Sequence, residues 1–312
     1  MEQQTVTMIK AGAMATILAL ILYKMAVSSP LFILPLLFFA PRFKPNGWAI
    51  VPVGLTLVIL VAYSLYGSSE LLRTSSALGA LLVGLYFPLS SLIGAGTWIL
   101  FPDKRLLTRL LLSSIFATLA GFALVYWFSL GGPVASGTAQ FYQKLVASVT
   151  ANILPMGLSS EALFLTVVAI VKRAFLPLFM GQFGFCALVS TLLIYRDDSS
   201  FQERMSRWQL PQNFVWIFLG SWTIVLFTLL VKIPILEIFG WNVALATTLL
   251  YMVQGVSIVA MFIRRKTPRV TATRVFALSF LLAFVPGVNL VVWLALPLLG
   301  VVETWIAFRK TS

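Results

Sequence analysis

Apolar residues follow one another in long uninterrupted runs along most of this chain, and short polar segments separate the runs. Runs of about twenty residues match the hydrocarbon thickness of a bilayer when they are helical, whereas barrel strands would show alternating runs of about ten. Because backbone groups in lipid must be satisfied internally, the pattern predicts an all-α polytopic transmembrane helix bundle with about 8–10 membrane segments. The expected apolar segments, of which adjacent short ones could fuse, are 8–27, 48–66, 75–100, 106–130, 162–171, 175–195, 213–231, 241–263, 275–284 and 290–308.

Two stretches depart from this pattern. Residues 30–40 are apolar but too few to span without tilting, and they contain Pro30 and Pro35, so we expect a short re-entrant or broken segment there. Residues 139–154 are amphipathic, so we expect a helix that lies flat in the membrane interface on the outer face. Its polar positions recur every four residues: Gln140, Lys144, Ser148 and Asn152.

Composition agrees with a membrane protein. Hydrophobic residues make up 60% of the 312 residues and charged residues only 10%, whereas soluble domains are about half apolar and about a quarter charged. No polar stretch is long enough to form a soluble domain. We therefore predict a single integral membrane domain over residues 1–312, with an N-terminal half of about 1–195 and a C-terminal half of about 196–312.

The net charge of +13 would suit a nucleic-acid-binding protein, but the distribution of the charge argues against that class. The basic residues lie in short loops between apolar runs, where the positive-inside rule places them. The densest are 101–109, 196–207, 264–274 and the C-terminus. We predict a multi-pass protein of a bacterial cytoplasmic membrane with both termini in the cytoplasm, membrane lipids as partners and no nucleic acid.

Residue types needed for common active sites are missing from the sequence. Histidine is absent, and Cys186 is the single cysteine, which excludes an intrachain disulfide, a Cys/His zinc site and an imidazole base. Neither a phosphate-binding loop nor a nucleophile elbow occurs. We predict no catalytic residue, no metal and no cofactor, and hence no enzyme.

Polar residues inside or beside the apolar runs are the candidates for a solute site. Gln254 lies in the middle of its run, and Lys144, Asn152 and Glu161 lie near the expected outer face. These four residues are the predicted solute-binding positions. The alternatives are an interhelical hydrogen bond for Gln254 and, for the amphipathic stretch, a helix that only anchors the outer surface.

Small residues form a stripe on the first apolar run. Ala11, Ala15 and Ala19 are spaced by four residues and lie on one helix face. Small side chains allow another helix to approach closely. The stripe therefore docks either a partner membrane subunit or another helix of the same chain.

The C-terminal half carries a family resemblance. It contains Trp208-Gln209-Leu210-Pro211, Gln254-Gly255 and Arg264-Arg265, and it ends in a tail with Gly300, Glu303, Trp305 and Arg309. This pattern resembles the YybS-like family of predicted bacterial membrane proteins, a domain of unknown function. The family usually has aspartate where Glu303 stands and often a second aspartate at the position of Ala307. The resemblance implies that the tail residues form a motif, without implying an activity.

The N-terminal half is similar to the substrate-binding S components of energy-coupling-factor vitamin transporters, whose general fold the rod-shape protein MreD is thought to share. The similarity rests on the alanine stripe followed by the short segment at 30–40. It implies a docking role for Ala11, Ala15 and Ala19 and a solute near the outer face. Two functions stay open: a small-solute-binding or transport subunit, and a non-transporting membrane scaffold of an envelope complex.

Overall fold

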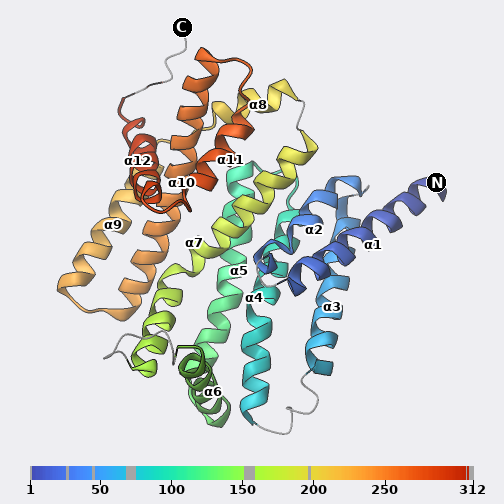
Figure 1. Ribbon diagram of the computed structural model, residues 1–312, viewed down its shortest axis with the longest axis vertical. Helices are drawn as coiled ribbons and strands as arrows, with labels where there is room; N and C mark the ends of the chain where they lie inside the picture. Colours follow the sequence, from blue (N-terminus) through green and yellow to red (C-terminus); the bar gives the residue numbers. More distant parts are fainter. Residues whose placement is uncertain are drawn as a thin grey trace. The chain divides into compact units, whose positions relative to one another are not determined.

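A computed structural model describes residues 2–25, 28–43, 46–67, 75–150, 159–195, 198–306 and 308. These residues form helices joined by turns and contain no strand, which confirms the predicted all-α bundle (Figure 1). Six helices are long and apolar enough to cross a membrane, and four shorter apolar helical stretches accompany them in the described part of the chain. The protein is therefore a multi-pass integral membrane protein.

The chain divides into two compact units, Met1–Thr191 and Leu192–Ser312. The division falls near the end of α7 (Ser160–Ile194), close to the point where the sequence changes from one half to the other. Each unit has its own buried residues and its own helix contacts.

Unit 1 is built around α4, which packs against helices that precede and follow it in the sequence. In Figure 1, α4 and α5 run side by side along most of their lengths. Aromatic side chains from α7 and from the short segment before α3 fill much of the core. The helices are α1 (Glu2–Lys24), α3 (Ile50–Gly67), α4 (Ser75–Leu100), α5 (Leu106–Ser129), α6 (Pro133–Thr150) and most of α7, and a 3-10 turn, η3 (Asn46–Ala49), precedes α3.

The short segment expected at 30–40 is a broken helix. It consists of η1 (Ser29–Leu31), α2 (Leu34–Phe39) and η2 (Ala40–Arg42), and most of its apolar side chains are buried. The Gln182 side chain of α7 donates a hydrogen bond to the Pro30 carbonyl at 2.8 Å. Irregular backbone within a membrane is tolerated where protein surrounds it. Here the Gln182 side chain supplies a hydrogen-bond donor to one of its carbonyl groups.

The amphipathic stretch forms α6, which exposes Gln140, Lys144 and Ser148. Its Thr138 packs against α4 at Gly79, where an added Cβ would collide with the threonine side chain. The expected amphipathic helix is present, and its position in the membrane interface stays a prediction.

The two runs expected at 162–171 and 175–195 form one helix, α7, which is the fusion of adjacent runs that the sequence left open. Lys172 and Arg173 lie half-buried within the helix and do not end it, because charged side chains leave the backbone hydrogen bonds intact. At 1.5 Å per residue the helix is about 52 Å long, well beyond the roughly 30 Å of a hydrocarbon layer.

Unit 2 is organised around α10, the longest of its helices, which contacts each of the others. In Figure 1, α9 and α10 form a hairpin, and α8 and α11 lie beside the opposite end of α10. The elements are α8 (Ser199–Ser206), α9 (Phe214–Leu230), α10 (Pro234–Lys266), α11 (Ala272–Leu282) and α12 (Val288–Val302).

The last helix is shorter than the predicted segment 290–308. It ends at Val302, and a turn follows in which the Thr304 and Trp305 amides donate to Val301 and Val302. Glu303 at this turn lies against α10 rather than continuing a membrane-spanning helix. Helix α12 therefore ends within the apolar run, at the point where Glu303 contacts Gln254 of α10.

Candidate functional site

The backbones of α10 and α12 touch at a pair of glycines. A Cβ added to Gly255 on α10 would collide with the Leu296 carbonyl on α12, and one added to Gly300 would collide with the Tyr251 carbonyl on α10. Only glycine leaves room for such an approach. The two glycines thus bring the polar side chains beside them within hydrogen-bonding distance.

Gln254 uses both ends of its amide at this crossing. Its Oε1 accepts a hydrogen bond from the Leu210 backbone N–H at 3.0 Å. Its Nε2 donates to the Gly300 carbonyl at 3.1 Å and to Glu303 Oε2 at 2.9 Å. The side chain is 1% exposed, so these protein contacts take the place of water. Gln254 therefore joins α10, α12 and the segment before α9.

Glu303 brings an ionisable group to this site. It is 3% exposed and stands at the C-terminal cap of α12, where the helix dipole is negative. A carboxylate at this position adds to the negative potential of the helix end. The site therefore combines a buried carboxyl group with the negative end of a helix dipole.

The site lies deep along α10. Gln254 precedes Arg264 by ten residues, which corresponds to about 15 Å along a helix. Arg264 belongs to the basic end of α10, and half of a hydrocarbon layer is also about 15 Å. If the basic end marks the membrane surface, Gln254 and Glu303 lie close to the bilayer midplane.

Part of the site is non-helical backbone. The chain between α8 and α9 is not helical around Trp208 and Leu210, and Leu210 is buried with its N–H bound to Gln254. Such backbone at membrane depth is found where protein or a cavity surrounds it. Gln254 supplies the partner that this N–H would lack in lipid.

The structure brings together three of the residues singled out in the sequence: Gln254, Gly300 and Glu303. Trp305 lies beyond the end of α12 and is exposed. Arg309 and Asn152 fall outside the described residues. The sequence did not single out Leu210 and Gly255 as site residues, although both stand within the motifs of the family resemblance.

The other described solute-binding candidates belong to unit 1. Lys144 on α6 and Glu161 at the start of α7 are exposed and belong to unit 1, whereas Gln254 is buried in unit 2. The described contacts of Gln254 include neither of them. A solute-binding role for these four residues stays a prediction.

The alanine stripe is packed inside unit 1. Ala11, Ala15 and Ala19 are all buried, and α1 contacts α2 and α3. The Thr16 hydroxyl of the same helix donates to the Pro52 carbonyl of α3 at 3.4 Å. This arrangement agrees with the intramolecular alternative, because the chain's own helices already cover the stripe.

A search for potential metal ligands in the described part of the chain finds no group of three or more His, Cys, Asp or Glu side chains. Comparison with known proteins finds no match among protein-family models, curated proteins or solved structures. The functional argument therefore rests on the site itself.

Proposed function

We propose that this membrane protein is a solute-transport subunit without a catalytic reaction of its own, and that Glu303 is its ionisable centre. The observation that supports this proposal is the buried contact between Gln254 and the Glu303 carboxyl at 2.9 Å. Ionisable residues inside a membrane bundle are costly, and where they occur they commonly belong to solute, ion or proton pathways.

Two further features of the site are typical of transport proteins. In secondary transporters, interrupted helices place helix ends and unwound backbone near the bilayer midplane, where the C-terminal ends favour cations. Here the C-terminal end of α12 and the non-helical backbone at Leu210 meet at the Gln254 side chain. The resemblance of the N-terminal half to S components points to the same class of protein.

Purification from native membranes tests this proposal. Wild type, Glu303→Gln and a control, Glu203→Gln, would be compared by mass spectrometry of co-purifying small molecules and proteins. Glu203 is an exposed carboxylate paired with Arg207 on α8, so its replacement leaves the buried site intact. We expect a small molecule to accompany wild type and the control and to be lost from Glu303→Gln. A small molecule that stays bound to Glu303→Gln would contradict the proposal.

A membrane scaffold is the second candidate. It is favoured by the Gln254 amide, which is fully engaged in holding helices together, and by the glycine contact, which leaves no space between the backbones. In that case stoichiometric protein partners would co-purify with wild type and with Glu303→Gln alike, and no small molecule would depend on Glu303.

We further propose that the protein resides in a bacterial cytoplasmic membrane with both termini in the cytoplasm. The clustered basic residues of 101–109, 196–207 and 264–274 support this orientation. Reporter fusions after Lys310 and within 264–274 should both report the cytoplasm. A periplasmic signal from either fusion would contradict this topology.

A further inference from the structure

Two basic stretches that lie far apart in the sequence meet at one end of unit 2. The Arg264 Nη1 of α10 donates to the Gln202 carbonyl at 2.7 Å and to the Ser206 hydroxyl at 3.0 Å, both on α8. The Gln202 side-chain oxygen in turn accepts a hydrogen bond from the Thr273 backbone N–H of α11 at 3.2 Å. These contacts hold α8 against α10 and α11, which lie beside it in Figure 1.

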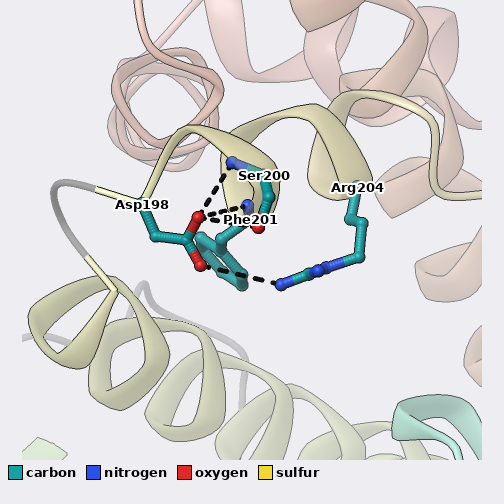
Figure 2. Close-up of polar contacts among 4 residues, drawn as sticks. All are labelled: Asp198, Ser200, Phe201 and Arg204. Carbon is teal, nitrogen blue, oxygen red and sulfur yellow. Dashed lines mark hydrogen bonds and ion pairs between the residues drawn. The ribbon is translucent and has the colours of Figure 1, made fainter.

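The cations at this end differ in how they are compensated. Arg204 lies 3.8 Å from Asp198 (Figure 2). Arg207, at the C-terminal cap of α8, lies 2.8 Å from Glu203, so both arginines have acidic neighbours. Four other exposed cations have no carboxylate within ion-pair distance among the described residues. We name these four the basic corner: Arg265, Lys266, Arg269 and Arg274.

Exposed apolar side chains border the basic corner on two helices. Lys266 and Phe262 are four residues apart on α10, and Phe262 is 43% exposed. Arg274 and Leu278 have the same spacing on α11, and Leu278 is 56% exposed. Residues four apart lie on the same helix face. Each helix thus presents a cation directly beside an apolar surface.

We propose that the basic corner binds the phosphate of an anionic phospholipid, with the acyl chains lying along Phe262 and Leu278. A water-soluble anion would satisfy the cations and leave the apolar surface uncovered, whereas a phospholipid matches both parts. Arginine binds phosphate oxygens through two parallel N–H groups, and lysine adds a compact charge. Basic surfaces of this kind beside membrane helices recognise anionic headgroups.

The test uses the full chain, delipidated in a neutral detergent, with lipid binding titrated by native mass spectrometry. Phosphatidylglycerol should bind more tightly than phosphatidylcholine. The variant Lys266→Gln/Arg274→Gln should bind phosphatidylglycerol about 25-fold more weakly, at about fivefold for each cation. The matched control is Lys104→Gln/Arg105→Gln, which removes two exposed cations from unit 1 and should leave the affinity unchanged.

Three results would overturn the proposal: equal affinity for phosphatidylcholine, an equal loss in the Lys104→Gln/Arg105→Gln control, or full displacement of the lipid by inorganic phosphate. The last would identify a soluble anion as the ligand. The variant Phe262→Ser/Leu278→Ser also distinguishes a phospholipid from a soluble anion, because it should weaken lipid binding only if acyl chains lie along these two side chains. The conservative variant Lys266→Arg/Arg274→Lys keeps both charges and should lose less affinity than Lys266→Gln/Arg274→Gln. An unfolding temperature of Lys266→Gln/Arg274→Gln equal to that of wild type excludes misfolding as the cause of a loss.

Discussion

Each unit of the protein contains a buried glutamine in the middle of a long helix. Both glutamines form hydrogen bonds to other segments of their unit, but with different kinds of partner. In unit 1, Gln182 accepts from the Ser91 hydroxyl at 3.0 Å and donates to the Pro30 carbonyl at 2.8 Å. In unit 2, Gln254 accepts from the Leu210 amide and donates to the Gly300 carbonyl and to Glu303. Both side chains satisfy interrupted backbone that lipid could not satisfy.

The two glutamines differ in whether one of their hydrogen-bond partners can carry a charge. Among the described residues, Gln182 is hydrogen-bonded to the neutral Ser91 hydroxyl and Pro30 carbonyl, and these contacts explain its role in holding the broken segment in place. Gln254 also binds a carboxyl group, which can gain or lose a proton. A buried amide alone is therefore weak evidence for a functional site in a membrane bundle, and the ionisable partner distinguishes unit 2.

The largest expected effect comes from the glycine that positions Gln254. Gly255→Ala would push a methyl group into the Leu296 carbonyl, and overpacking of this kind costs about 1–3 kcal/mol or more. Thermal unfolding in detergent measures the loss. In the control Gly220→Ala on α9, nothing lies within 4 Å of the added Cβ, and we expect a gain of about 0.5–1 kcal/mol from helix propensity. Equal stability of the two variants would show that the close approach is unimportant.

Replacing the two glutamines sharpens the comparison directly. Gln254→Leu deprives three buried groups of a partner, and we expect it to lower the free energy of unfolding by about 1–3 kcal/mol. Gln182→Leu affects two neutral groups and should cost less. Both variants would be measured in one detergent by thermal unfolding. A larger loss for Gln182→Leu would place the more demanding contact in unit 1.

Substitutions of Glu303 separate hydrogen bonding from ionisation. Glu303→Gln retains an oxygen that accepts from Gln254, so the change in the free energy of unfolding should stay below about 1 kcal/mol. Glu303→Leu retains no acceptor and should be the less stable of the two. If both variants were equally stable, the contact with Gln254 would not contribute to folding.

The smallest effect is expected at Asp198, an exposed carboxylate of unit 2. Its side chain caps α8 by accepting from the Ser200 and Phe201 amides and from the Ser200 hydroxyl (Figure 2). These hydrogen bonds, first that of the Ser200 hydroxyl, lower the pKa of Asp198. A lowered pKa means that the stabilisation is present above the ordinary carboxyl pKa and is lost as the pH falls through the folded-state value.

Asp198→Ala should therefore lower the unfolding temperature slightly at neutral pH and have less effect in strong acid. Asp198→Asn, which caps helices about as well as aspartate, should keep the stability and remove this part of the acid dependence. Unfolding temperatures measured across the acidic range check both outcomes. An undiminished effect of Asp198→Ala in strong acid would contradict the assignment.

Much of the fold could be predicted because apolar runs and their interruptions are local features. The all-α bundle, the broken segment beginning with Pro30 and the helix carrying Lys144 all follow from run length, proline and the spacing of polar residues. The continuity of α7 through Lys172 and Arg173 could not be predicted, because hydropathy registers the two charges as an interruption while the helix backbone does not.

The partners of each buried residue were decided by tertiary structure. Gln254 meets Leu210 and Glu303 across 44 and 49 residues of sequence, and no local pattern specifies such a pairing. Likewise, the spacing of Ala11, Ala15 and Ala19 shows a close-packing face but not what covers it. The structure covers it with helices of the same chain.

The physical reason is that lipid is as apolar as a protein interior. In a soluble protein the polar face of a helix marks its outside, but in a membrane the outward and inward faces are both apolar. Leu230 is 85% exposed and Ile258 is fully buried, and the sequence presents them as the same kind of residue. Sequence by itself therefore determined that this chain is a helical membrane protein and where most of its helices run. Only the tertiary structure decided which faces meet, and so it alone placed Glu303 beside Gln254.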